Sequence, residues 1–259
     1  MSEENEKRLS FSGYSTWKGC SYRYKLEYVD GHRERSENIY VNFGSAIHNT
    51  LEHLSNNNAN LNEIFEVEYD KLINENKHLE DYYRGQSDND NTWKAQGYQI
   101  LDQVRDFFDE TFPGYEIVSS EEEIFIPIEG TDWKIYGFAD IIIAYKKKFW
   151  ILDFKSTSYG WNRDKKQDPI ILMQPQLYKY FWCQKHDANH KDVNIGFLLL
   201  KRTVKKDNIE LFRASGSPAK LEQAAIAVKT AILNIERERW LKNRLSCKYC
   251  PFYKTDLCT

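Results

Sequence analysis

Two aspartates and a lysine on apolar segments are the residues of this sequence best suited to chemistry. Asp140 ends one apolar run, and Asp153 and Lys155 interrupt a second. Side chains alternate between faces along a strand, so Asp153 and Lys155 point to one face and Phe154 to the other. Burying such a pair costs on the order of several kcal/mol unless something compensates. A divalent cation would compensate for this cost, because Mg²⁺ binds through one or two carboxylates plus water.

A second interpretation of Asp153 and Lys155 stays open at this point. The Asp-x-Lys tripeptide is common, and a structural salt bridge at the edge of a sheet would also explain it.

The segments around these residues are predicted strands. They are rich in β-branched and aromatic residues and are separated by short polar turns, which predicts a three-stranded antiparallel meander. Residues 193–202 are mostly apolar, with an unbroken run at 195–200, which predicts a strand buried on both faces and inserted parallel after a crossover helix. Asp168-Pro169 begins that helix, and residues 209–212 are a possible edge strand. The predicted meander strands are residues 121–128, 135–140 and 149–155.

Helices are predicted on both sides of the strands in the sequence. Ser12 can cap a first helix, and apolar residues at helical spacing predict an amphipathic helix over residues 41–55. On its other face His48 lies one turn after Gly44, although an isolated histidine is more often a surface or capping residue. Two or three helices follow between residues 61 and 112, with a polar loop at 85–91. Ser217-Pro218 opens a last helix that runs toward Trp240.

The composition is that of a globular protein with a substantial core. The chain has 259 residues, 41% hydrophobic content and a net charge of -3. The charge argues against a surface that binds nucleic acid indiscriminately. Local clusters of basic residues either contact phosphates or are solvated turns, and they are Lys146 to Lys148, Arg163 with Lys165 and Lys166, and Lys201, Arg202, Lys205 and Lys206. The apolar runs are too short for a membrane helix and the first residues do not form a secretory signal, so we expect a cytoplasmic protein.

Four motifs in a fixed order resemble the RecB-like branch of the PD-(D/E)XK nucleases, which includes RecB and AddB nuclease domains, CRISPR adaptation nucleases and many phage exonucleases. The motifs are Gly44/His48, Gly137/Asp140, Asp153/Lys155 and Gln174/Tyr178. The resemblance implies an α/β (α+β) fold, with a central mixed β-sheet that contains an antiparallel meander and is flanked by helices. It further implies a restriction-endonuclease-like core and a helical N-terminal insertion.

The resemblance also implies roles for these residues. Asp140, Asp153, His48 and the backbone carbonyl of Phe154 would hold Mg²⁺ or Mn²⁺. Lys155 would position or deprotonate the attacking water. The motif pair Gln174 and Tyr178 would steer the DNA backbone or buttress the site.

Three C-terminal cysteines have the spacing of metal ligands. Cys247, Cys250 and Cys258 lie within twelve residues, although the gap before Cys258 is longer than in the family pattern. The resemblance pairs such a triplet with a distant N-terminal cysteine, here Cys20, to hold a four-iron four-sulfur (4Fe-4S) cluster. Zinc is the alternative, since it also accepts four thiolates. Cys183 is interpreted as a core residue.

The predicted function is a metal-dependent DNA exonuclease for recombination, repair or phage DNA processing. The alternative is a non-catalytic DNA-binding or scaffold subunit of a recombination or CRISPR-adaptation complex. DNA is the expected partner and would be bound without sequence specificity. A helicase or recombination partner would supply any unwinding. We expect one nuclease domain over residues 1–259, with a helical part at 1–114, a catalytic sheet core at 115–215 and a helix with the cysteines at 216–259.

Overall fold

The computed structural model describes residues 6–33, 37–79 and 90–259, which form two compact units. The first unit consists of Met1–Arg35, Glu123–Gly137 and Ser217–Thr259. The second consists of Ser36–Glu122 and Phe138–Gly216. The expected single nuclease domain and its three parts stay a prediction.

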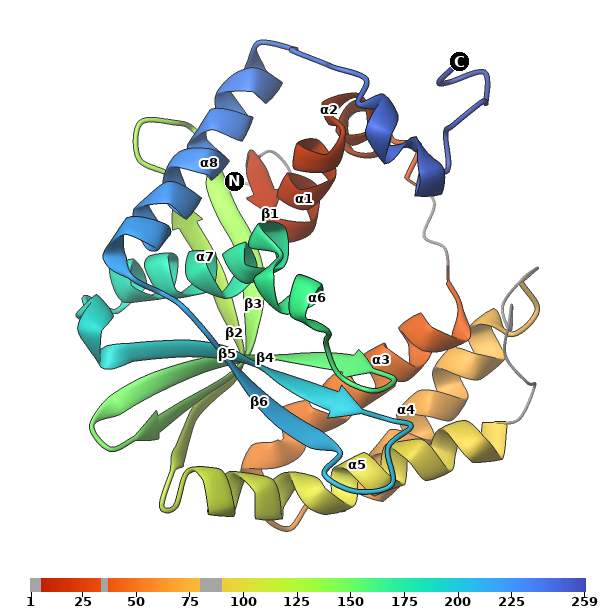
Figure 1. Cartoon of the computed structure of the whole chain (residues 1–259), viewed down its shortest axis with the longest axis vertical. Coiled ribbons are helices and arrows are strands. Elements are labelled where there is room, and N and C mark those ends of the chain that lie inside the picture. The colour runs from red at the N-terminus through yellow and green to blue at the C-terminus, as the bar shows by residue number, and fades with distance from the viewer. Residues whose placement is uncertain (1–5, 34–36, 80–89) are drawn as a thin grey trace. The chain divides into compact units, whose positions relative to one another are not determined.

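The second unit contains the sheet predicted from the sequence together with two sets of helices (Figure 1). Its strands are the end of β3 (Lys134–Tyr145), the start of β2 (Glu116–Pro127), β4 (Lys148–Thr157), β5 (Val193–Lys201) and β6 (Ile209–Ala214). Its helices are α3 (Ile39–Leu51), the 3₁₀ turn Glu52–Ser55, α4 (Leu61–Asn76), α5 (Asp90–Thr111), α6 (Arg163–Gln167), α7 (Pro169–Lys185) and the 3₁₀ turn His190–Asp192.

The strand pairing confirms a central mixed sheet. Strand β2 pairs with β3, β3 runs antiparallel to β4, and β6 runs antiparallel to β5. Strand β5 is parallel to β4, with Asp153 opposite Phe197. Helix α7 packs on both β4 and β5, so it is the crossover helix that a parallel connection needs.

Strand β5 is apolar from Ile195 to Leu200 because both faces of the sheet are covered. Leu198 and Leu200 belong to the core formed with α3, α4 and α5. Phe197 and Leu199 point to the opposite face, where they pack with Trp161 and with apolar residues of α7. A strand with helices on both faces cannot show a period-two pattern, which explains its sequence.

The helical layer of the second unit packs closely around aromatic side chains. A Cβ atom on Gly97 of α5 would lie 2.2 Å from Cε1 of Phe65, so the glycine is what lets α5 approach α4. Asn38 caps α3, because its side chain accepts hydrogen bonds from the backbone N–H groups of Tyr40 and Val41. The helix therefore begins at Ile39, earlier than predicted, and its last predicted residues form the 3₁₀ turn.

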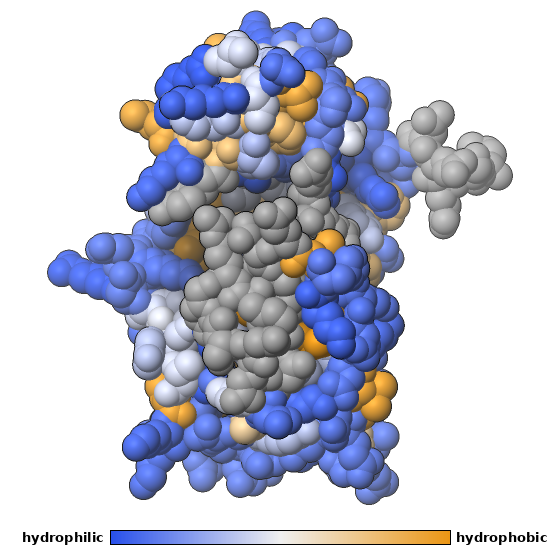
Figure 2. Space-filling view, turned by 90° about the vertical axis from the view of Figure 1, so that its right-hand side faces the viewer, coloured by the Kyte–Doolittle hydropathy of each residue, from blue (hydrophilic) through white to orange (hydrophobic). Residues whose placement is uncertain are grey.

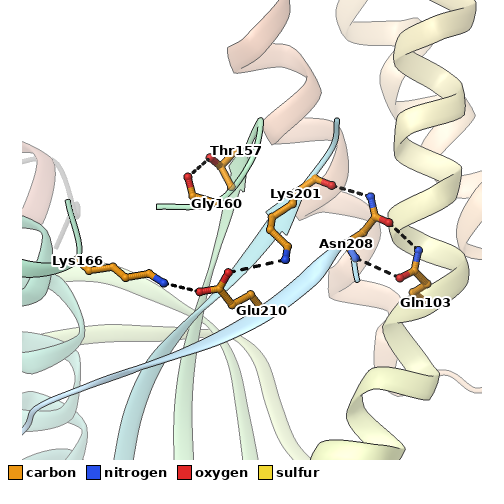
Figure 3. Close-up of polar contacts among 7 residues, drawn as sticks. All are labelled: Gln103, Thr157, Gly160, Lys166, Lys201, Asn208 and Glu210. Carbon is orange, nitrogen blue, oxygen red and sulfur yellow. Dashed lines mark hydrogen bonds and ion pairs between the residues drawn. The ribbon is translucent and has the colours of Figure 1, made fainter. Parts of the chain in front are cut away.

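The hairpin between β5 and β6 is fixed to α5 by buried amides (Figure 3). Asn208 is fully buried, donates to the carbonyl of Lys201 at 2.6 Å, and accepts from the side chain of Gln103 at 2.9 Å. Glu210 lies 2.6 Å from the ammonium of Lys166 and 3.8 Å from that of Lys201. Two of the candidate phosphate contacts are therefore already paired with a carboxylate.

The first unit joins the N-terminal segment to the C-terminal segment. Its elements are β1 (Arg8–Ser10), α1 (Phe11–Gly19), α2 (Ser21–Tyr24), a π-helical turn (Lys25–Val29), α8 (Pro218–Glu236) and a 3₁₀ helix (Arg244–Tyr249). Strand β1 pairs parallel with the first residues of β3, with Leu9 opposite Ile135. The backbone N–H of Tyr22 donates to the carbonyl of Leu241 at 3.2 Å.

The structure corrects several predicted boundaries. The first helix is capped by Ser10 and not by Ser12, because the Ser10 hydroxyl accepts from the N–H of Gly13. Helix α8 ends at Glu236, before Trp240. Residues 85–89 of the predicted polar loop lie outside the described residues, and α5 already includes residues 90 and 91.

In the part of the chain that the structure describes, the helices are too short or too polar to cross a membrane. On the face shown in Figure 2, hydrophobic residues lie in small groups among hydrophilic ones.

Candidate functional site

Asp140 and Asp153 lie side by side at one end of the β3–β4 pair. The paired stretch of these strands ends with Ile141 opposite Leu152, and the two aspartates are the next residue on each strand. Oδ2 of Asp140 accepts a hydrogen bond of 2.5 Å from the backbone N–H of Phe154. The pairing of the two strands thus holds both carboxylates in place.

His48 reaches this point from α3 because a glycine lets the helix approach β4. A Cβ atom on Gly44 would lie 3.0 Å from the hydroxyl of Ser156, a tight contact, so a larger residue would have to displace this hydroxyl or the helix. One turn later, Nε2 of His48 lies 3.0 Å from the carbonyl oxygen of Phe154. A carbonyl only accepts hydrogen bonds, so Nε2 carries the proton and Nδ1 has a free lone pair.

The free lone pair of His48 faces a carboxylate. Its Nδ1 atom lies 3.6 Å from Oδ2 of Asp140. Two acceptors that face each other need a proton or a cation between them. Glu121 lies close to both residues, since ligand atoms of His48, Glu121 and Asp140 all lie within 4.8 Å of one another. One imidazole nitrogen and two carboxylates form a donor set that fits Mn²⁺ or Mg²⁺.

Glu121 is the residue of this group that the sequence did not indicate. It lies in β2, where two further glutamates follow it, and the run resembles the solvated face of a strand. Its backbone has a φ of 49°, in the left-handed region. No sequence signal marks this conformation, because glycine or asparagine is the usual residue there.

Asp153 and Lys155 form an ion pair beside the group of three. The Lys155 ammonium lies 2.6 Å from Oδ2 of Asp153, whose side chain is 2% exposed. Burial lowers the pKa of Lys155, but the charges of Asp153 and Asp140 outweigh it, so its pKa is raised overall. Lys155 is therefore a cation at neutral pH.

The other titratable groups of the site are shifted toward their neutral forms. Burial and then the charge of Asp153 raise the pKa of Asp140 well above its ordinary value. Burial, Glu52 and Asp153 raise the pKa of Glu121. Burial also lowers the pKa of His48, against the opposing effect of Asp153. The site thus holds an excess of carboxylates, which a divalent cation would stabilise.

Gln174 and Tyr178 lie together on α7. The amide of Gln174 donates to the hydroxyl of Tyr178 at 3.2 Å. Burial and the charge of Asp153 raise the pKa of Tyr178, so the phenol stays neutral. Asp153 belongs to the face of the sheet that α7 covers, since it pairs with Phe197.

The basic residues near the sheet differ in whether their charged groups could contact a phosphate. Arg202 is buried, with its guanidinium over the rings of Trp93 and Tyr40, and it donates to Ser158 at 2.8 Å. It therefore has a role in packing. Lys165 of α6 lies over the ring of Trp161, and burial and the charge of Lys155 lower its pKa.

The four predicted cluster cysteines lie around one cavity of the first unit. The cavity has a volume of about 150 Å³, and its lining includes Cys20, Cys247, Cys250 and Cys258. All four are free thiols. Cys183 is buried in the second unit, where burial raises its pKa to about 11, as suits a core residue.

The raised pKa of Asp140 predicts how stability depends on pH without metal. Above the ordinary pKa of 3.8, the Asp140 carboxyl ionises in the unfolded chain but stays protonated in the folded one. The free energy of unfolding therefore falls as the pH rises from 3.8 to the raised pKa and is constant above it, as far as this residue is concerned. Asp140→Asn removes that effect. In EDTA the variant should unfold at a higher temperature than the wild type at pH 8, with the difference vanishing below pH 3.8. Scanning calorimetry across this pH range measures it; a variant less stable at pH 8 would contradict the account.

One solved structure shares the fold of this chain. A protein of Eubacterium rectale, named a "putative exonuclease", is 16% identical with a TM-score of 0.60 over 97% of this chain and 91% of its own. SSO0001 is also 16% identical, with a TM-score of 0.37 over 89% of this chain and 91% of its own. No curated protein sequence matches this chain.

The sequence profile of one family covers nearly the whole chain. The profile of the PD-(D/E)XK nuclease superfamily matches residues 8–255. The match spans both compact units, the acidic site between β3 and β4, and the first two cysteines of the C-terminal triplet. The chain belongs to the PD-(D/E)XK nuclease superfamily.

Proposed function

We propose that this protein is a metal-dependent DNA exonuclease of the RecB-like branch. The observation that carries the proposal is the pair of acceptors formed by His48 and Asp140, beside the Asp153–Lys155 ion pair. A structural salt bridge would explain the ion pair but not the two acceptors that face each other. Family membership supports a nuclease acting on DNA.

Each residue of the site has a distinct proposed role. Asp140, Asp153, His48 and the carbonyl of Phe154 hold Mg²⁺ or Mn²⁺. The bound ion supplies Lewis-acid polarisation of the phosphoryl oxygen and a water of lowered pKa.

Lys155 acts by its positive charge in this proposal. Because its pKa is raised, the ammonium donates hydrogen bonds and offsets charge on the phosphate, and it orients the attacking water rather than removing its proton. Gln174 and Tyr178 hold the DNA backbone against the α7 face of the sheet through their neutral amide and hydroxyl groups.

Two observations support the proposal that the enzyme acts on DNA ends. One is the RecB-like order of the four motifs in the sequence. The other is the fold shared with the Eubacterium rectale protein, whose name is "putative exonuclease". The proposal also includes a use in recombination, repair or phage DNA processing. It further includes a helicase partner and a cytoplasmic location. The alternative is a non-catalytic DNA-binding subunit, and the next experiment distinguishes it from the exonuclease.

Removing either member of the ion pair should abolish cleavage. Asp153→Asn and Lys155→Ala should each lower the rate by on the order of a hundredfold or more, because a positioned charged group is lost. Release of nucleotides from end-labelled linear single- and double-stranded DNA, with Mg²⁺ or Mn²⁺, measures this.

Two controls make this experiment specific. Lys148→Ala changes an exposed lysine of the same strand and should retain wild-type activity. Covalently closed circular DNA offers no ends and should remain intact. Wild-type protein that cleaves no substrate with either metal would support the DNA-binding subunit instead. Because Lys155→Ala leaves the buried Asp153 carboxylate without its partner, thermal unfolding of each variant is measured in parallel.

We also propose that Cys20, Cys247, Cys250 and Cys258 hold a 4Fe-4S cluster. A zinc ion with bonds of about 2.3 Å would draw four thiolates to roughly 3.8 Å from one another. A cavity of about 150 Å³ among the four thiols leaves room for a larger group. The cluster would join the N-terminal helices to the C-terminal segment, and closing so long a loop restricts the unfolded chain.

The cysteine proposal predicts a coloured protein. Purified without oxygen, it should be brown and contain iron and inorganic sulfide, and Cys20→Ser should lose both together with thermal stability. Cys183→Ser, the matched control, changes a cysteine outside this cavity and should keep the iron. Metal analysis and visible absorption measure the outcome. A colourless wild type with one zinc per chain would support the zinc alternative, and unchanged iron in Cys20→Ser would exclude Cys20 as a ligand.

A further inference from the structure

We propose that Glu121 of β2 is a direct ligand of the divalent cation, alongside His48 and Asp140. The inference rests on the proposed metal-dependent activity and extends its ligand set to a strand that none of the four sequence motifs includes. It also gives the site a carboxylate that is not engaged by Lys155, in contrast to Asp153.

The first argument is geometric. Ligand atoms of Glu121, His48 and Asp140 lie within 4.8 Å of one another and come from β2, α3 and β3. Three separate elements thus bring ligand atoms together around one point, as the binding of a small cation needs.

The second argument is the neighbourhood of Glu121 compared with that of the next residue. Glu122 lies 2.6 Å from the ammonium of Lys185 and 3.0 Å from Nε2 of His186, so cations surround it. Glu121 instead is half-buried beside the carboxylates of Glu52 and Asp153. Among the described residues no lysine or arginine forms an ion pair with it. A half-buried carboxylate among other carboxylates has to take up a proton or bind a cation, and a divalent cation would stabilise its ionised form.

The third argument is the backbone of Glu121. Its φ of 49° is unfavourable for a residue with a side chain and lies within a strand. Such a residue bends the strand and re-aims its side chain, as bulges beside active sites do. Glycine would adopt this backbone without strain, so the glutamate side chain is what the position requires.

Titration of metal-free full-length protein with Mn²⁺ in a calorimeter tests the assignment without relying on activity. Glu121→Gln should weaken Mn²⁺ binding by about tenfold or more, since losing even an indirect ligand contact has an effect of that size. Glu116→Gln is the matched control, because it removes an exposed charge from the same strand and should bind as the wild type does.

Thermal unfolding of Glu121→Gly provides the second measurement and separates a ligand from a structural residue. In EDTA this variant should unfold at a higher temperature than the wild type, because glycine relieves both the backbone strain and the repulsion between carboxylates. Added Mn²⁺ should raise the unfolding temperature of the wild type far more than that of the variant.

The outcomes distinguish this inference from the proposed function. If the wild type binds Mn²⁺ and cleaves DNA while Glu121→Gln binds Mn²⁺ equally well, Glu121 is not a ligand and the proposed function stands. A wild type that neither binds Mn²⁺ nor cleaves DNA would overturn both. Loss of Mn²⁺ binding in Glu121→Gln and Glu121→Gly, with folding retained, establishes the ligand.

Discussion

The antiparallel pairing of β3 with β4 forces two aspartates together in a place where water is largely excluded. Asp140 and Asp153 directly follow the last pair of the register, and only 9% and 2% of their surfaces are exposed. Burial and then the charge of Asp153 raise the pKa of Asp140, and each buried carboxylate needs a compensating partner. The Phe154 N–H and the Lys155 ammonium supply part of that compensation, and a divalent cation would supply the rest.

The remaining elements of the second unit serve to keep these groups in register. Helices on both faces of β5 allow the central strands to be wholly apolar up to the site. Gly44 brings α3 close enough to β4 for His48 to contact the Phe154 carbonyl, and that contact fixes which imidazole nitrogen remains free. Such support from the backbone is what orients ligand histidines in proteins. The rigid sheet therefore determines the chemistry, through hydrogen bonds that involve the main chain.

The sequence predicted the parts of this arrangement that depend on periodicity and spacing. The strands around Asp140 and Asp153, the crossover helix and the parallel strand β5 are confirmed, because burial on one or both faces leaves a clear pattern. Glu121 was missed because a left-handed residue inside a strand leaves no such pattern. Ser10 rather than Ser12 caps α1, since either serine could precede the helix and only the backbone geometry decides. That the four cysteines line one cavity depends on contacts between distant segments, which spacing alone does not encode.

The central claim is that a divalent cation binds where His48 and Asp140 face each other. The most direct measurement is anomalous diffraction at the manganese absorption edge from crystals of the full chain grown with Mn²⁺. The account predicts a peak about 2.0–2.3 Å from ligand atoms of His48 and Asp140. Crystals that contain Mn²⁺ but show no peak there, with His48 and Asp140 still 3.6 Å apart, would contradict it.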